Sequence, residues 1–273
     1  MKRLDWNKTK TIFIIVFSIL NVFLYWLYLS RITETQNVQV MGQTSIEESL
    51  RLDNITFTEL PQATKDSSYV SAKIVTFTPE QTKKLEHQTI DGLNSTHLQS
   101  TMDIPIKIRN GKGDYSFPEF LTKYVLHGLE YVLWHVDEEQ QKALFFQKVN
   151  ANPIYFSPDA MLEIHWDEEG NVTHYDQRMF GEFVSFNRKK DLLSPIEAIG
   201  SLSSRGHLKQ DSKIKGMELG YSTLVQLTQT QVFAPTWHVR VELKDGGMED
   251  YFVHAVEGKI IEFQAEPLDD NHE

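Results

Sequence analysis

The feature that most constrains this chain is an uncharged, strongly apolar run from Ile12 to Leu29. At a rise of about 1.5 Å per residue, a helix of this length extends roughly 27 Å, close to the hydrocarbon thickness of a bilayer. Lys2, Arg3, Lys8 and Lys10 precede the run. Because cytoplasmic flanks of membrane helices carry an excess of lysine and arginine, the pattern predicts a membrane helix with a cytoplasmic N-terminus.

The end of the apolar run favours an uncleaved anchor over a cleaved signal peptide. Signal peptides usually have a shorter apolar region, about 7–15 residues, followed by a small-x-small cleavage site. Here the run ends in Tyr25, Trp26 and Tyr28, whose rings suit a membrane interface, and no such site follows. We therefore expect a single-pass protein of the cell membrane whose C-terminal part is extracytoplasmic.

Composition limits the partners of the part beyond the anchor. Five basic residues and Asp5 lie at or before position 31, which leaves a net charge of −15 for residues 32–273. An acidic surface of this size argues against nucleic acid and anionic lipid as partners. The chain has no cysteine, so neither disulfides nor thiol chemistry are expected. A hydrophobic content of 40% is enough for a packed core.

An internal repeat with an offset of 76–78 residues follows position 110. Ser116–Glu119 and Ser194–Glu197 each combine a capping box with a proline in the first turn, and Gly128 and Gly206 lie twelve residues after the serines. Each set predicts a helix of about ten residues that ends near its glycine.

The hydrophobic pattern after each predicted helix also recurs at this offset. Alternating apolar residues, a glycine turn and a tyrosine predict a hairpin with one solvent-exposed face and one buried face. The helix is expected to cover the buried face. Two unrelated domains with the same cap and turn chemistry are the alternative to a duplication. The matching sets are Phe156–Pro158 with Phe233–Pro235, Leu162, Ile164 and Trp166 with Val239, Val241 and Leu243, Gly170 with Gly246, and Tyr175 with Tyr251.

The predicted fold class is α+β, with one N-terminal transmembrane helix followed by tandem extracytoplasmic helix-plus-antiparallel-sheet domains. In the N-terminal segment, the patterns predict a short helix at Ser45–Glu48, a strand over Tyr69–Phe77, a helix from Pro79 to His87 and a loop over Asp91–Thr101. The predicted divisions are a cytoplasmic stub (1–11), a transmembrane helix (12–29), a stem and N-terminal α/β segment (30–110), two repeats (111–190 and 191–266) and a polar tail (267–273).

The N-terminal stretch Leu4–Ile15 has a specific form, D-W-x-K-x-K-T-I-F-I-I, and Leu20-Asn21 follows it inside the apolar run. This opening resembles the YycI (also called WalI) family of low-GC Gram-positive bacteria. The resemblance covers nearly the whole chain in outline, and the ending Tyr251–Ile261 is similar to that of a PepSY-type module. The additional Lys2-Arg3 and the polar tail depart from the family pattern.

The resemblance implies an accessory regulator of the essential WalK–WalR (YycG–YycF) two-component system, which controls cell-wall metabolism. Such proteins act with a sister protein, YycH, and contact the sensor histidine kinase WalK (YycG) through membrane helices and outer domains. The family is not known as an enzyme, and its outer part is described as tandem α+β domains related to those of YycH.

One face of the predicted membrane helix carries nearly all its polar groups, at Ile14, Ser18, Asn21, Tyr25 and Tyr28, which step by four and three. On this face, Asn21 and Ser18 can meet a partner helix. The alternative is that Ser18 bonds a carbonyl one turn back and the tyrosines only contact the interface. We favour that alternative for Ser18, and a partner for Asn21, because an amide at mid-bilayer depth has few other ways to satisfy its hydrogen bonds.

Motifs for catalysis or cofactor binding give little support to an enzyme. The chain has no HExxH, GxSxG, Walker A or GxGxxG sequence. Ser212–Lys215 fits S-x-x-K but lacks the accompanying SDN and KTG, so we interpret it as a chance match, and Asn110–Asp114 as a flexible linker. We therefore predict no catalytic residue and no cofactor.

The histidines raise the question of a metal site. His165 and His174 can face each other across the Gly170 hairpin, with the acids Asp167–Glu169 nearby. Those acids fall in the turn, and His165 is out of phase with its apolar neighbours, so a solvated surface is the ordinary explanation. The same reasoning applies to His238 and His254, and no metal is predicted.

The leading hypothesis is a membrane-anchored regulator that works by binding. An extracytoplasmic receptor with a ligand groove between the repeats is one alternative, and an envelope enzyme or a PepSY-like protease inhibitor is another.

Overall fold

The computed structural model describes residues 10–11, 13–27, 43–57, 59–62, 66–109, 113–186, 190–227 and 229–263. The helices are α2 (Gln43–Leu52), α3 (Pro79–Thr82), α4 (Phe117–Tyr124) and α5 (Pro195–Ser204), with 3-10 turns η1 (Gly128–Glu130) and η2 (Pro158–Ala160). The strands are β1 (Thr56–Phe57), β2 (Asp66–Ser67), β3 (Val70–Ile74), β4 (Gln88–Asp91), β5 (Leu98–Lys107), β6 (Tyr131–Asp137), β7 (Lys142–Val149), β8 (Asn152–Tyr155), β9 (Met161–Trp166), β10 (Asn171–Gln177), β11 (Phe180–Ser185), β12 (Lys190–Asp191), β13 (Lys213–Gln226), β14 (Thr230–Glu242), β15 (Met248–His254) and β16 (Ile260–Ile261).

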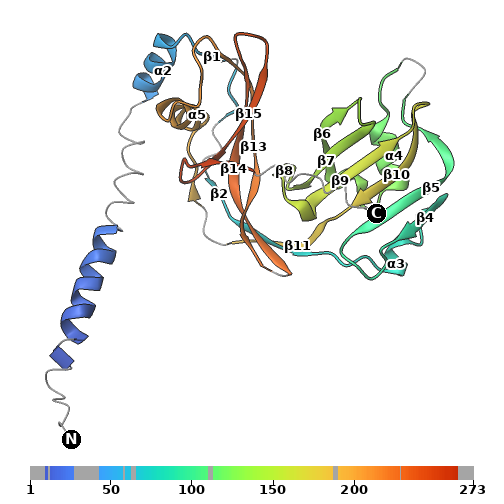
Figure 1. Ribbon diagram of the computed structural model, residues 1–273, viewed down its shortest axis with the longest axis horizontal. Coiled ribbons are helices and arrows are strands. Elements are labelled where there is room, and N and C mark those ends of the chain that lie inside the picture. The colour runs from blue at the N-terminus through green and yellow to red at the C-terminus, as the bar shows by residue number, and fades with distance from the viewer. Residues whose placement is uncertain are drawn as a thin grey trace, which may run out of the picture.

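The molecule consists of two halves, which are defined by their position in space and not by chain order. In the first half, α4 packs against one face of an antiparallel sheet with the order β6-β7-β9-β10-β5-β4 (Figure 1). The helix buries Phe117, Phe120 and Leu121 against this sheet. The predicted alternation holds in β9, where Leu162 and Ile164 are fully buried and the residues between them lie on the opposite face. Glu163 and His165 lie on that opposite face, which is partly exposed there, whereas Phe146 of β7 on the same face is buried against the second half.

The second half packs α5 and α2 against the antiparallel strands β13, β14 and β15. The predicted capping box of α5 is confirmed, because Ser194 Oγ accepts from the Glu197 backbone at 3.4 Å and Glu197 Oε2 accepts from the Ser194 backbone at 2.7 Å. Gly206, which follows α5, has the positive φ of +73° that a helix-ending glycine adopts. The mixed α+β class predicted from the sequence is therefore confirmed.

Strand β8 joins the two halves, and no sequence pattern predicts it. It pairs antiparallel with β7 and parallel with β13, where Ile154 lies opposite Tyr221 and Tyr155 opposite Ser222. The strands of both halves consequently belong to one hydrogen-bonded sheet of 14 strands. The contact also buries the second face of β14, where Thr236 is fully buried and His238 is 6% exposed. The prediction of one wet face per sheet is wrong for this strand.

The first predicted helix differs from its counterpart. Ser116 does not cap α4, because its Oγ donates to the Ile108 carbonyl at 3.1 Å. The helix ends at Tyr124, so Gly128 is not its terminal glycine. Gly128 is required for a different reason, since a Cβ there would lie 2.0 Å from the carbonyl oxygen of Leu121.

The N-terminal segment contributes to both halves. Strand β3 pairs with β14 and β11, whereas β4 and β5 extend the first sheet. The helix predicted from Pro79 to His87 is shorter, since α3 ends at Thr82. The loop predicted over Asp91–Thr101 is also partly wrong, because β5 begins at Leu98, where pairing with β10 overrides the polar local sequence.

A buried histidine holds the turn after β15. His254 is 5% exposed, and its Nδ1 accepts hydrogen bonds from the backbone N–H groups of Val256 at 3.2 Å and Glu257 at 3.1 Å. Burial is the main cause that lowers the pKa of His254 below its ordinary value. The neutral ring that this turn needs is thus the form that the structure favours.

We expect Gly128→Ala to destabilise the protein by about 1–3 kcal/mol, because the new Cβ must displace the backbone of α4. Chemical denaturation followed by circular dichroism measures the change. Gly216→Ala is the matched control, since a Cβ at Gly216 meets no atom within 4 Å. Equal destabilisation by the two substitutions would contradict the steric explanation.

Candidate functional site

A groove of about 700 Å³ lies between the two halves. Strand β6 supplies one wall through Val132, Leu133 and Trp134, and the segment 59–62 adds part of the rim. Strands β13 and β14 supply the opposite wall through residues 215–218, His238 and Arg240. The groove thus depends on the contact between the halves and belongs to neither sheet alone.

Aromatic rings from both halves meet beside this groove. The Trp134 ring from β6 lies 5.0 Å from the His238 ring of β14 and 5.1 Å from the Phe146 ring of β7, measured between centroids. Such pairs contribute about 0.5–1.5 kcal/mol each beyond the area that they bury. The further rings of this aromatic seam are Tyr155, Phe156, Phe252 and Phe263.

A charged group borders the aromatic seam. The Asp250 carboxylate accepts from His238 Nε2 at 2.6 Å and from Arg240 Nε at 2.9 Å, and the Arg240 guanidinium lies 5.5 Å from the Trp134 ring. Burial alone would raise the pKa of Asp250, but the hydrogen bonds from His238 and Arg240 outweigh it and lower the pKa below its usual range. The carboxylate therefore stays ionised and orients His238 and Arg240, which both line the groove.

Tyr155 contributes a buried polar atom to the seam. Its side chain is 1% exposed, and its hydroxyl has no hydrogen-bond partner among the residues that the structure describes. Burial raises the pKa of Tyr155, with smaller contributions from Glu218 and Asp250. Neither Tyr155 nor Trp134 was singled out from the sequence, since no local pattern indicates that β6 and β8 contact the second half.

Strand β6 has a strand partner on one side, β7, within the described part of the chain. Its other edge therefore offers backbone donors and acceptors next to the groove. The pairing with β7 shifts between Leu133 and His135, which is a bulge. Exposed strand edges of this kind are docking sites for extended peptide segments.

The predicted partner-binding face of the membrane helix lies partly within the described helix 13–27. Ile14, Ser18, Asn21 and Tyr25 belong to it and are all exposed, whereas Tyr28 lies outside the described residues. In the residues with assigned positions, no helix combines the length and the apolar character needed to cross a bilayer. Ile12 and Leu29, the ends of the predicted span, also lie outside those residues, so the anchor and its contact face stay predictions.

The S-x-x-K match contains a buried serine. Ser212 is 1% exposed, and its Oγ has no hydrogen-bond partner in the described ranges, so no base contacts it there. The ammonium of Lys215 forms an ion pair with Glu242 at 3.1 Å.

The histidines of the first hairpin do meet, on the open face of the first sheet. The rings of His165 and His174 stack with centroids 4.3 Å apart. Asp167 stays in the turn, where its Oδ1 accepts from the Asn171 backbone at 2.8 Å. The acid that joins the pair is instead Asp176, which the sequence reasoning missed although it is two residues beyond His174. The ligand atoms of these three side chains all lie within 4.8 Å of one another.

Comparison with known proteins identifies the family. The family model for YycI protein matches residues 33–256, which is most of the chain. The chain belongs to the YycI family. No curated protein matches it.

Two solved structures are similar to this YycI chain at low identity. An uncharacterized protein from Eubacterium rectale has a TM-score of 0.45 and 12% identity, over 78% of this chain and 92% of the other. The Bacillus megaterium YpeB C-terminal domain has a TM-score of 0.38 and 14% identity, over 79% and 93%.

Membership of the YycI family supports a regulatory accessory role in the WalK–WalR system. The family is not known as an enzyme. For this YycI chain, the groove and its edge strand are accordingly of interest as a binding surface.

We expect Asp250→Asn to destabilise this YycI chain by about 1.5–3 kcal/mol at pH 7, because two charge-assisted hydrogen bonds are weakened. The folded pKa of Asp250 is lowered, so its contribution is complete above the unfolded pKa of about 3.9 and is lost as pH falls through the folded pKa. The difference from the natural chain should therefore shrink below about pH 4.

Urea denaturation at several pH values measures this difference. Asp191→Asn serves as the control, since Asp191 is an exposed aspartate of β12. A difference that stays constant from pH 7 to pH 3 would show that the charge of Asp250 is not the cause.

Proposed function

We propose that this protein is a membrane-anchored accessory protein that binds and modulates the sensor histidine kinase WalK (YycG), together with a YycH-type partner. The family match over residues 33–256 is the observation that carries the proposal. The apolar run Ile12–Leu29 with its basic flank supports a single-pass anchor, a cytoplasmic N-terminus and an extracytoplasmic C-terminal part.

The first contact surface of the proposal is the polar face of the anchor. An asparagine side chain in hydrocarbon needs hydrogen-bond partners, and a bond across helices contributes about 0.6–2 kcal/mol. Asn21 lies in the middle of the apolar run and shares its helix face with Ile14, Ser18 and Tyr25. A partner helix of the kinase is the natural source of these bonds.

The second contact surface is the groove with the edge of β6. Leu133 on this edge is 43% exposed, and Trp134 and Arg240 flank the same groove. A partner segment in extended conformation can add to the edge of β6 through backbone hydrogen bonds while its side chains enter the groove. This binding mode suits a regulator, because it requires neither a bound cofactor nor a catalysed reaction.

The groove also supports the alternative of a ligand-binding receptor. Its volume of about 700 Å³ falls within the usual range of small-molecule sites. A saturable small ligand that binds the purified chain without the kinase would favour this alternative over docking of a partner segment.

We expect Asn21→Leu to reduce co-purification of the chain with the kinase from membranes and to change the output of the two-component system. The reason is the loss of hydrogen bonds between helices, while the anchor becomes more apolar and still inserts. Val22→Leu is the control, since position 22 lies about 100° around the helix from Asn21. Unchanged association and unchanged signalling in Asn21→Leu would remove the anchor contact from the proposal.

A photo-crosslinking amino acid at Leu133 should capture the kinase or its YycH-type partner in intact membranes. The same probe at Leu93, which is similarly exposed at 39% but lies in the loop between β4 and β5, should capture neither. Immunoblotting of the crosslinked products measures both. Capture from Leu93 alone would place the partner elsewhere and contradict the groove as the docking surface.

A further inference from the structure

The open face of the first sheet brings histidines and acids together by strand pairing. Glu163 and His165 on β9 are two residues apart and share this face, as do His174 and Asp176 on β10. In the antiparallel pairing, His165 lies opposite His174 and Glu163 lies opposite Asp176. These two residue pairs thus place four side chains, all of types that can bind metal ions, next to one another.

The distances within this group suit a small cation. The ligand atoms of His165, His174 and Asp176 lie within 4.8 Å of one another. Two atoms bound to one zinc ion, each at about 2.0–2.2 Å, are about 3.0–3.5 Å apart. The backbones are already fixed by the β9–β10 ladder, so closure needs only side-chain rotation, in which the stacked imidazoles turn their nitrogens toward a common point.

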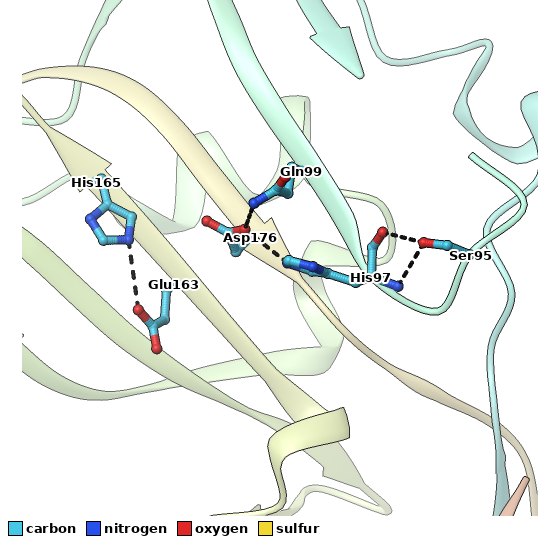
Figure 2. A network of polar contacts seen from close by, with 6 residues as sticks. All are labelled: Ser95, His97, Gln99, Glu163, His165 and Asp176. Carbon is cyan, nitrogen blue, oxygen red and sulfur yellow. Dashed lines mark hydrogen bonds and ion pairs between the residues drawn. The ribbon is translucent and has the colours of Figure 1, made fainter. Parts of the chain in front are cut away.

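Neighbouring side chains hold the ligands in place. Asp176 Oδ1 accepts from Gln99 Nε2 at 2.8 Å and from His97 Nε2 at 2.8 Å. Figure 2 shows both bonds on the same oxygen, while the second carboxylate oxygen turns toward the side of His165. Such outer partners orient metal ligands and are a regular part of metal sites.

The two histidines also have polar neighbours. His174 Nδ1 lies 2.9 Å from the hydroxyl of Thr173, which leaves its Nε2 as the nitrogen for a metal. His165 Nε2 lies 3.6 Å from Glu163 Oε2, so the Glu163 carboxylate is beside the group.

We propose that His165, His174 and Asp176 form a binding site for a divalent transition-metal ion of the Zn²⁺ type. Two imidazole nitrogens and one carboxylate oxygen match the three-protein-ligand sets that leave the fourth zinc position to water. Imidazole ligands disfavour Mg²⁺ and Ca²⁺, which take oxygen ligands. The ion would tie β9 to β10 on the face opposite α4, and none of its three ligands lines the groove.

Isothermal titration of the purified full-length chain, stripped with a chelator and titrated with Zn²⁺ alone, tests the site. We expect one ion per chain, no comparable heat from Mg²⁺, and at least a tenfold weaker affinity in His165→Gln, in His174→Gln and in Asp176→Asn. His87→Asn is the matched control, because His87 is exposed, lies outside the cluster and has a positive φ that asparagine tolerates.

Two results would overturn the proposal. One is an unchanged Zn²⁺ affinity in the double variant His165→Gln/His174→Gln, and the other is an equal loss in His87→Asn. Far-ultraviolet circular dichroism verifies that each variant is folded before titration. Visible absorption of the Co²⁺-loaded chain gives an independent readout, since bands of a histidine-ligated site should be present in the natural chain and absent in Asp176→Asn.

Discussion

The contact between the two halves is the constraint on which the rest of this structure depends. Strand β8 pairs with β7 on one side and β13 on the other, and the aromatic seam packs beside it. This contact creates the groove, buries the second face of β14 and places Arg240 over the Trp134 ring. Without it, two small helix-covered sheets would have separate surfaces, and the open edge of β6 would not border a groove.

Local sequence signals predicted α5 and the two glycine turns, where local energetics decide the structure. Gly170 and Gly246 both adopt the positive φ that their turns require, and the capping box of α5 forms as its sequence indicates. The repeated tyrosines also have related roles. Tyr175 of β10 donates to the carbonyl of Tyr124, the last residue of α4, at 2.7 Å. Tyr251 of β15 donates to the carbonyl of His207, shortly after the end of α5, at 2.8 Å.

The long-range contacts could not be predicted in the same way. Strand β8 lies within an N-P-I-Y segment that has no distinctive hydrophobic pattern. Through its pairings it connects β7 with β13, two strands that are distant from each other in sequence. In the histidine group, the hairpin pattern indicated that His165 and His174 can face each other, but the exact register depends on a bulge in β10 between Val172 and His174. A period of two cannot reveal such a bulge, and His97 reaches Asp176 from 79 positions away. The group therefore depends on register and tertiary pairing.

The turn that His254 holds has a consequence for the C-terminal edge of the molecule. The ring serves there as an acceptor for two backbone N–H groups, which an imidazolium cannot do. The folded pKa of His254 is depressed, so its stabilising effect is complete above the unfolded value of about 6.5 and declines as the medium becomes more acidic. Acidification would thus weaken the turn that connects β15 to β16, and with it the register in which these two strands pair.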